Sequence, residues 1–262
     1  MNAGLLWSAS ASHQPKGPTV FSEFARAPRP EGCLRVVSWN CQMALDRKAD
    51  RLLALSPDIA VVPECSDKAR LDGLDRVGWT GVNAIKGLAV FARPDLGAVV
   101  DESLDATREW YLPIALPSLG LNILAAWSMH HRGGEAGQPR GRIHRTIEHY
   151  AGFLAGGRTM LIGDLNDNIT WDTPTYPSFA RVTSVLEDLG LTNLYLARSG
   201  EAVGAETIPT LFFLRHLDEP YFVDHAFVPR DWLPRVRAFE IGRPDDWLAV
   251  SDHMPLVLDL EV

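Results

Sequence analysis

Short apolar segments bounded by glycine, proline or aspartate recur along most of the chain. They are rich in Val, Ile, Leu, Phe and Ala, which is typical of β-strands. None approaches the length of about 20 apolar residues that a membrane-spanning helix requires. The pattern predicts strands at residues 34–39, 58–63, 87–93, 121–127, 159–164, 221–229, 235–241 and 255–262.

Other segments repeat their apolar residues with the period of an α-helix. One helix is predicted over residues 141–156, with an apolar face of Ile143, Ile147, Tyr150 and Leu154. A second is predicted over residues 180–190, with Gly190 as its C-terminal stop, and a third over residues 51–55. Because the strands greatly outnumber the helices, the pattern favours two sheets packed face to face with helices outside.

Residues 1–32 differ in composition from the rest of the chain. They mix Ser, Ala, Pro and Gly without apolar periodicity, which is typical of a loose leader. No linker-like segment follows, so we expect residues 33–262 to form one folded domain. A chain of 262 residues with 46% hydrophobic and 22% charged residues is compatible with one large layered domain.

The net charge of −8 argues against a sequence-blind nucleic-acid binder, although a locally basic groove is compatible with it. The cysteines, Cys33, Cys41 and Cys65, are odd in number and lack metal-binding spacing, which disfavours a disulfide framework or a zinc site. The N-terminus has neither the charged start nor the long apolar middle of a secretory signal. We therefore expect a cytoplasmic protein.

Polar residues follow the predicted strand at 159–164. An extended chain places Asp164 and Asn166 on one side and Leu165 on the other. A carboxylate beside a carboxamide suits magnesium, manganese or calcium rather than zinc. The alternative is an ordinary polar turn or helix N-cap, which uses the same residue types.

Similar polar residues stand at other strand ends. Asn40 follows the first strand, Glu64 follows Pro63 at the expected end of the second, and Asp252 and His253 precede the last. Each of them alone is also compatible with a solvated turn. Asp224 interrupts an apolar strand, and because a buried carboxylate is costly unless paired, we expect it to have a partner such as a histidine ring.

These strand ends become informative when they are considered together. If they converge, several carboxylates share one cleft, and their mutual repulsion raises their pKa values unless a divalent cation offsets it. The sequence therefore predicts a metal site.

The motifs "SWN", "PEC", "GDLN", "VDH" and "SDHMP", in this order, resemble the five signatures of the endonuclease/exonuclease/phosphatase superfamily. "PEC" departs from the usual Gln-Glu. The resemblance covers roughly residues 34–262 and implies a four-layer α/β/β/α sandwich of two mixed sheets flanked by helices. It identifies residues 33–262 as a catalytic domain.

The resemblance also implies roles for individual residues. Glu64 resembles the main metal ligand, helped by Asn40 and Asp252, with magnesium as the expected ion and manganese as the alternative. Asp164 resembles the group that orients or deprotonates the attacking water, and Asn166 positions that water or a phosphoryl oxygen. His253 resembles the histidine that contacts the phosphate or activates the nucleophile, with Asp224 holding its ring. The sequence leaves open whether Asp164 or His253 is the base.

The chain departs from the family after the strand at residues 121–127, where members usually carry a His or Tyr. Trp127, His130 and His131 compete for this place, and we select His130 as a catalytic candidate. The loop that follows offers Arg132, Arg140 and Arg142 to a phosphate, and Arg215 is a further candidate.

The expected function is a magnesium-dependent phosphoesterase, foremost a phosphodiesterase or nuclease that hydrolyses its substrate by in-line water attack. The alternatives are a phosphomonoesterase for a small or lipid-linked phosphate and a non-catalytic binding protein on the same fold. The expected partner is a phosphate-ester substrate, with nucleic acid among the candidates. No obligatory protein partner is inferred.

Overall fold

The computed structural model describes residues 29–104, 110–128, 143–175 and 178–262. The leader predicted for residues 1–32 lies almost wholly outside this range, as does the stretch with His130, His131 and Arg132. Within the described ranges, no helix is both long and apolar enough to cross a membrane.

The first sheet has six strands in the order β13-β14-β1-β2-β4-β3. β1 and β2 run parallel, and the other neighbours are antiparallel. Every residue of β1 is buried, as expected for a central strand covered on both faces. The strands are β1 (Cys33–Ser38), β2 (Ile59–Cys65), β3 (Asp75–Asn83), β4 (Lys86–Ala92), β13 (Val236–Ile241) and β14 (Leu256–Glu261).

The second sheet also has six strands, in the order β5-β6-β7-β8-β12-β9, with only β7 and β8 parallel among its described pairs. A separate two-stranded hairpin joins β10 (Leu211–Phe212) to β11 (Pro220–Tyr221). The strands of the second sheet are β5 (Val99–Val100), β6 (Tyr111–Leu116), β7 (Leu121–Trp127), β8 (Thr159–Asp164), β9 (Leu191–Asn193) and β12 (Asp224–Pro229).

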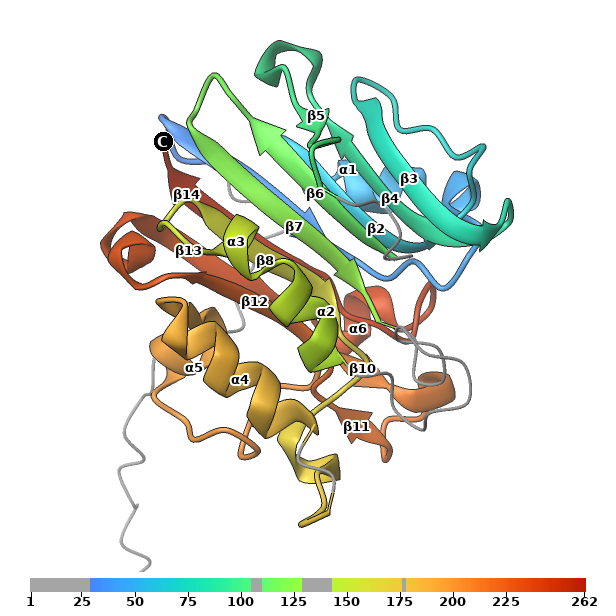
Figure 1. Ribbon diagram of the computed structural model, residues 1–262. Helices are drawn as coiled ribbons and strands as arrows, with labels where there is room; N and C mark the ends of the chain where they lie inside the picture. Colours follow the sequence, from blue (N-terminus) through green and yellow to red (C-terminus); the bar gives the residue numbers. More distant parts are fainter. Residues whose placement is uncertain (1–28, 105–109, 129–142, 176–177) are drawn as a thin grey trace, which may run out of the picture.

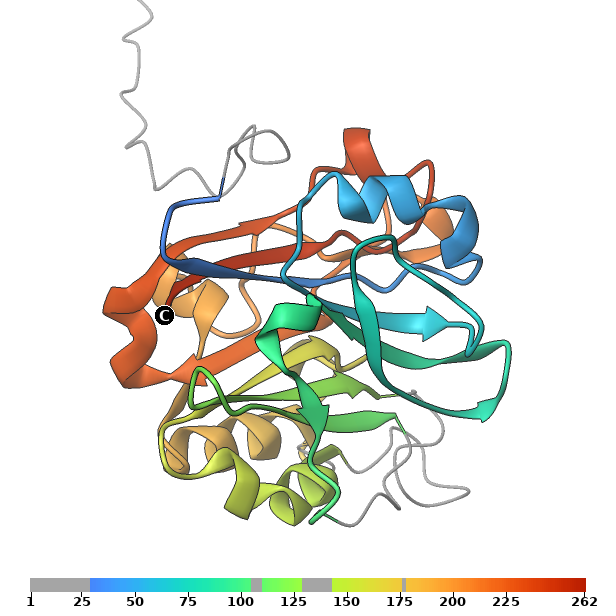
Figure 2. The ribbon, with the colours of Figure 1, turned by 90° about the horizontal axis from the view of Figure 1, so that it is seen from above.

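The two sheets pack face to face, with helices on their outer sides (Figures 1 and 2). α2 (Ile143–His149), α3 (Ala151–Leu154) and α4 (Ser178–Asp188) cover the second sheet through a separate apolar cluster that includes Ile147, Tyr150 and Val182. The first sheet is flanked by α1 (Ala49–Leu53) and α6 (Pro244–Trp247), and α5 (Leu194–Ser199) follows β9. The predicted α/β sandwich of two mixed sheets with flanking helices is therefore confirmed.

Short 3₁₀ helices connect several of these elements: η2 (Leu45–Arg47), η3 (Pro94–Leu96), η4 (Ile169–Trp171), η5 (Phe213–Arg215) and η6 (Arg230–Arg235).

Several predicted boundaries were wrong. The helix expected over residues 141–156 is divided at Tyr150 into α2 and α3. The strand expected over residues 221–229 belongs to two different sheets, β11 and β12. β2 does not end at Pro63 but continues through a β-bulge to Cys65, because a bulge tolerates the missing proline donor. The pattern missed β3 and β6, whose Gly and Pro residues interrupt the apolar run.

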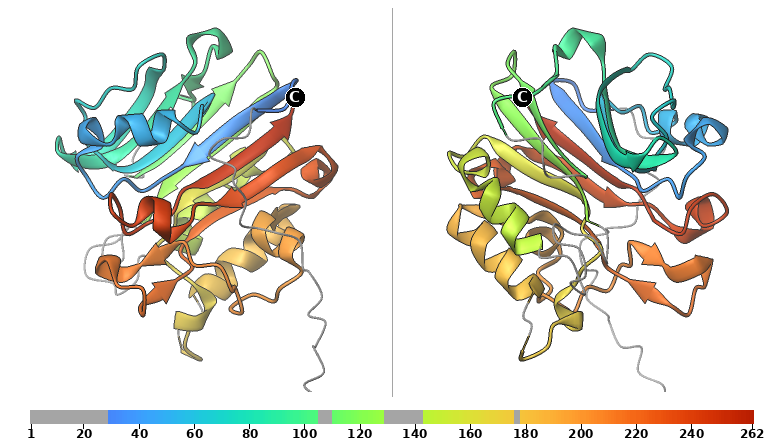
Figure 3. Two further views of the ribbon diagram at one scale, coloured as in Figure 1. Left: turned by 180° about the vertical axis from the view of Figure 1, so that it is seen from behind. Right: turned by 45° about the vertical axis from the view of Figure 1, so that its right-hand side comes forward.

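A buried ion pair joins the central strands β1 and β14. Arg35 Nε and Nη2 each donate to a carboxylate oxygen of Asp259 at 2.7 Å, and the two residues are direct cross-strand neighbours. Their side chains are 2% and 0% exposed. The two strands lie side by side in the first sheet (Figure 3). The pair therefore helps to fix the register of β1 against β14.

We expect Asp259→Asn to lower the free energy of unfolding by roughly 3–5 kcal/mol, because it leaves the Arg35 charge buried without its carboxylate. Urea unfolding checks this value. The matched control is Arg237→Ala, which breaks an exposed pair with Glu261 and should cost at most about 1 kcal/mol. Equal losses in both variants would contradict the prediction.

Candidate active site

The strand directions of the first sheet bring four predicted residues to the same end of the sheet. β1 and β2 are parallel, so Asn40 and Glu64 lie at the same ends of neighbouring strands. β14 is antiparallel to β1, so Asp252 and His253 lie at this same end, just before β14 begins. Residues from three distant parts of the sequence are thereby collected.

The second sheet supplies the opposite wall of the site. Asp164 ends β8, and Asp224 begins the antiparallel β12 directly opposite it. Trp127 ends β7 beside Asp164. Gly163 is required here, because a Cβ at this position would lie 1.9 Å from the carbonyl oxygen of Ala126. The close packing of β7 and β8 thus fixes where Asp164 emerges.

Asn40 joins the two sheets through its side-chain amide. Its Nδ2 donates to Asp164 Oδ2 at 2.9 Å and to Glu64 Oε1 at 3.5 Å, and lies 3.4 Å from His253 Nε2. Its Oδ1 accepts from the backbone N–H of Gln42 at 3.0 Å. Asn40 therefore contacts three of the predicted site residues, and in this orientation its amide nitrogen faces the carboxylates.

Asp164 is fully buried and satisfied by amides. Besides Asn40, Asn166 donates to it twice, from the backbone nitrogen at 2.9 Å and from Nδ2 at 2.8 Å. Asn166 has a left-handed backbone with φ of 48°, so a turn, not strand alternation, returns its side chain to Asp164. Leu165 packs into the apolar cluster under the helices.

The alternative reading of "GDLNDN" as a capped turn is also present, two residues further on. Asn168 caps η4 by accepting from the backbone nitrogen of Thr170 at 2.9 Å. Its amide donates to the carbonyl of Phe222 at 3.0 Å. Asp164 makes an Asx-type turn of its own by accepting from the backbone nitrogen of Asn166, so the segment combines the expected turn chemistry with the candidate site.

His253 is oriented by Asp224. The distance between His253 Nδ1 and Asp224 Oδ2 is 2.8 Å, and His253 Nε2 lies 3.9 Å from Asp164 Oδ2. Thr210 Oγ1 in turn accepts from the backbone nitrogen of Asp224 at 2.9 Å. The predicted histidine partner of Asp224 is therefore found, with Nε2 directed toward Asp164 and Asn40.

Burial and mutual charge shift the protonation of this cluster. Burial raises the pKa of Asp164 above its ordinary range, and the nearby Asp224 charge adds to this, while His253 opposes it. For His253, burial lowers the pKa, but the carboxylates of Asp224 and Asp164 outweigh it and raise the pKa overall. The cluster therefore favours an imidazolium between two acids.

Glu64 and Asp252 form the outer part of the site. Glu64 sits in the bulge of β2 with φ of 59°, and its side chain is 19% exposed. Burial raises the pKa of Asp252, His253 opposes this rise, and the charge of Glu64 adds to it. A bulge of this kind redirects a side chain at the end of a strand.

Two sets of residues have the chemistry to hold a cation. One ligand atom from each of Asp164, Asp224 and His253 lies within 4.8 Å of the others, but the bond between Asp224 and His253 already uses two of these atoms. Glu64 and Asp252 form the second set. Their like charges act on each other, and they lie in the more accessible part of the site. The second set fits a hard divalent cation better, because both of its side chains offer oxygen. Binding there would break only the partly exposed contact of Glu64 with Lys86, not the buried Asp224–His253 hydrogen bond.

The other candidates have different positions. Arg215 donates to Gln42 Oε1 at 2.6 Å and to the Ala249 carbonyl, at the rim of the site. Trp127 is buried against Trp110. His130, His131, Arg132, Arg140 and Arg142 lie outside the described residues.

Ser251 and Lys86 also contact site residues, although the sequence predicted a role for neither. Ser251 Oγ donates to the carbonyl of Asn40 at 2.7 Å and accepts from the backbone nitrogen of His253 at 3.1 Å. Its place inside "SDHMP" was a signal that could have identified it. Lys86 Nζ lies 3.1 Å from Glu64 Oε1, and no sequence pattern indicated that contact.

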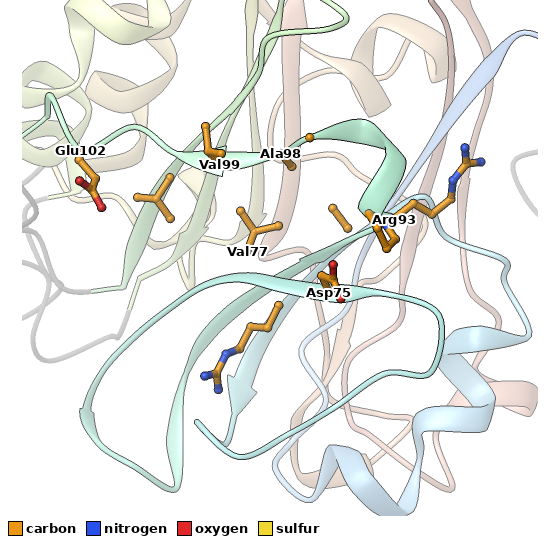
Figure 4. Close-up of a pocket in the computed structure, with 11 residues that line it drawn as sticks. Asp75, Val77, Arg93, Ala98, Val99 and Glu102 are labelled. Atoms are coloured by element: carbon orange, nitrogen blue, oxygen red, sulfur yellow. The ribbon is translucent and has the colours of Figure 1, made fainter.

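A cavity of about 370 Å³ lies elsewhere in the fold (Figure 4). Its lining includes Asp75, Arg93 and Val99. The neighbouring Ala92 pairs with Ile59 at the start of β2, whereas the candidate site is at the end of β2. The site is thus identified by its chemical groups and not by this cavity.

The sequence matches no family model and no curated protein, but the structure resembles several solved proteins. The endonuclease domain of TRAS1, a telomere-specific non-LTR retrotransposon, is 19% identical, with a TM-score of 0.64 over 87% of this chain and 98% of that one. The 3′ phosphatase NExo from Neisseria, bound to a product DNA hairpin, is 16% identical, with a TM-score of 0.64 over 87% of this chain and 100% of that one. An AP endonuclease from Archaeoglobus fulgidus is 16% identical, with a TM-score of 0.66 over 87% of this chain and 100% of that one. The chain has the endonuclease/exonuclease/phosphatase fold.

We expect Asp224→Asn to lower the pKa of His253, because the variant removes the negative charge that stabilises the imidazolium. Measurement by NMR titration of the imidazole nitrogens, with metal removed by chelation, tests this direction. Asp218→Asn removes an exposed charge and should leave the titration unchanged. An unaltered His253 midpoint in Asp224→Asn would refute the assigned contact.

Proposed function

We propose that this chain, which has the endonuclease/exonuclease/phosphatase fold, is a divalent-metal-dependent phosphoesterase. The observation that best supports this is the contact of one amide, Asn40, with Asp164, Glu64 and His253. Two carboxylates, an imidazole and an amide around one point match the needs of phosphate-ester hydrolysis. Such a reaction requires a bound water, a proton acceptor and donors to the phosphoryl oxygens.

The outer carboxylates, Glu64 and Asp252, would hold a magnesium or manganese ion, with Asn40 beside them. When bound, this ion supplies positive charge that offsets the negative charge gathering on the phosphoryl oxygens. Glu64 suits the task because its bulge directs it out of the strand while leaving it partly exposed.

The inner residues would handle the attacking water and its proton. Asp164 is held rigidly by two amide side chains, so we assign it as the proton acceptor. Asn166 would hold the water or a phosphoryl oxygen beside it. His253 has Nδ1 engaged with Asp224, which leaves Nε2 to donate to the phosphate. His130 remains a proposed additional donor.

The substrate class is proposed to be a phosphodiester, with nucleic acid foremost, because the similar structures include an endonuclease domain, an AP endonuclease and a 3′ phosphatase bound to a product DNA hairpin. The NExo protein is described both as a 3′ phosphatase and as a 3′-5′ exonuclease. This pair of descriptions keeps phosphomonoester hydrolysis as the second candidate for this chain.

With magnesium, the purified protein should hydrolyse a phosphodiester, and chelation should abolish the reaction. Asp164→Asn and His253→Ala should each lower kcat by about 100-fold or more, as loss of a general acid or base does. Assays on plasmid DNA, abasic duplex, RNA, inositol phosphates and sphingomyelin, run in parallel, identify the substrate. His149→Ala, an exposed histidine on α2, is the matched control. Wild-type rates in both site variants would reject the mechanism, and metal binding without hydrolysis of any substrate would favour a binding protein.

Glu64→Gln should weaken manganese binding, measured by calorimetry, by more than about 10-fold. A loss of about 10-fold is the lower end of what removing an outer partner of a metal ligand costs. Asp224→Asn should bind manganese nearly as well as the wild type, because we place the ion at Glu64 and Asp252. The reverse order of effects would move the ion to Asp164, Asp224 and His253.

A further inference from the structure

Lys86 places a positive charge inside the candidate site. Its Nζ lies 3.1 Å from Glu64 Oε1 and 5.4 Å from the centre of the Trp127 ring. Lys86 begins β4 in the first sheet, whereas Trp127 ends β7 in the second, paired with Asp164. The ammonium group therefore lies between the proposed metal ligand and the strand next to the proposed proton acceptor.

The backbone of Lys86 is anchored next to Glu64. Lys86 closes the hairpin between β3 and β4 by pairing with Asn83. The hairpin tip is fastened to the segment after Glu64, because the backbone nitrogen of Asp67 donates to the carbonyl of Ala84 at 2.9 Å. The side chain is nevertheless 32% exposed and has a flexible four-carbon stem. Its head group can thus change partner while its base stays fixed.

A purely structural role explains this arrangement poorly. A partly exposed ion pair contributes little to stability. At the same time, a cation held on Glu64 competes with any metal for that carboxylate. Once a divalent ion takes Glu64, repulsion between like charges drives the ammonium away from it. The contact with the face of Trp127 is already present and favourable, and it holds the ammonium near Asp164, where the proposed reaction places the phosphate.

We propose that Lys86 is a positioning residue for the substrate phosphate, exchanged from Glu64 to a non-bridging phosphate oxygen when the metal binds. This inference rests on the proposed function. In the metal-free site the ammonium neutralises Glu64, and in the loaded site it acts as a point charge on the phosphate, a common use of lysine. The same side chain therefore opposes metal binding alone and favours metal and phosphate binding together.

The test uses calorimetry on the full chain with manganese and inorganic phosphate as probes. Lys86→Met should bind manganese alone more tightly, by roughly 5-fold, the scale of a partly exposed ion pair. With manganese saturating, it should bind inorganic phosphate more weakly, by roughly 5- to 10-fold, on the same scale for a charge-assisted contact. Lys86→Arg should restore phosphate binding, and KM for the substrate should rise in Lys86→Met more than kcat falls.

Lys68→Met is the matched control, because it removes the same charge from an exposed position four residues after Glu64 and should leave both affinities unchanged. In a Glu64→Gln background, Lys86→Met should no longer tighten manganese binding. A thermal unfolding midpoint of Lys86→Met close to that of the wild type verifies that this variant is folded.

Unchanged affinities in Lys86→Met, or weaker binding of manganese alone, would overturn this inference and leave the proposed function standing. Opposite shifts of the two affinities without hydrolysis of any substrate would support the exchange and overturn the hydrolase. A wild-type protein that binds no divalent ion would overturn both.

Discussion

The hydrogen bond from Asn40 to Asp164 is the link on which the arrangement of the site depends. It joins the end of the first sheet to the end of the second at 2.9 Å. A buried carboxylate without such donors costs several kcal/mol, so Asp164 is stable only where Asn40 and Asn166 both reach it. The sheets must therefore pack in one relative position, and this position also brings Glu64 and His253 to the same amide.

Backbone strain is concentrated around this link. Gln42, Met43 and Ala44 have consecutive left-handed conformations, with φ of 48°, 64° and 50°, and Glu64 and Asn166 share this conformation. Non-glycine residues rarely adopt it, at a cost of about 1–3 kcal/mol each. The loop after Asn40 is tied down from outside, since Lys48 Nζ donates to the carbonyl of Cys41 and Arg215 donates to Gln42 Oε1. Packing and hydrogen bonding thus hold site residues in conformations that the local sequence does not favour.

Positive side chains offset part of the negative charge at the site. Asp224 and Asp164 flank His253, while Lys86 faces Glu64. Beside them, the β10–β11 hairpin presents exposed apolar side chains, including Leu214 and Leu217, and its Phe212 nitrogen bonds the carbonyl of Asp252. A fold alone does not set which ligand a site accepts, so segments such as this hairpin are where this chain can differ from other proteins of the same fold.

The apolar pattern of the sequence predicted the two packed sheets with outer helices, and it placed the candidate site residues at strand ends. Strands are recognisable from their β-branched and aliphatic residues, and polar residues collect where strands end. The apolar runs that end at Asp164, Asn40 and Glu64 could therefore be identified from the local sequence. Strands interrupted by glycine or proline, such as β3 and β6, carry a weak pattern and were missed.

Tertiary structure decided how these residues meet. The bulge at Glu64 and the contact of Lys86 with Glu64 depend on residues far away in the chain, so no local pattern could reveal them. The turn at Asn166 is held locally by Asp164, and the alternation expected of an extended chain did not predict it. Strand direction and sheet packing fix which ends converge. Those in turn depend on the whole buried core, including the Arg35–Asp259 pair across β1 and β14.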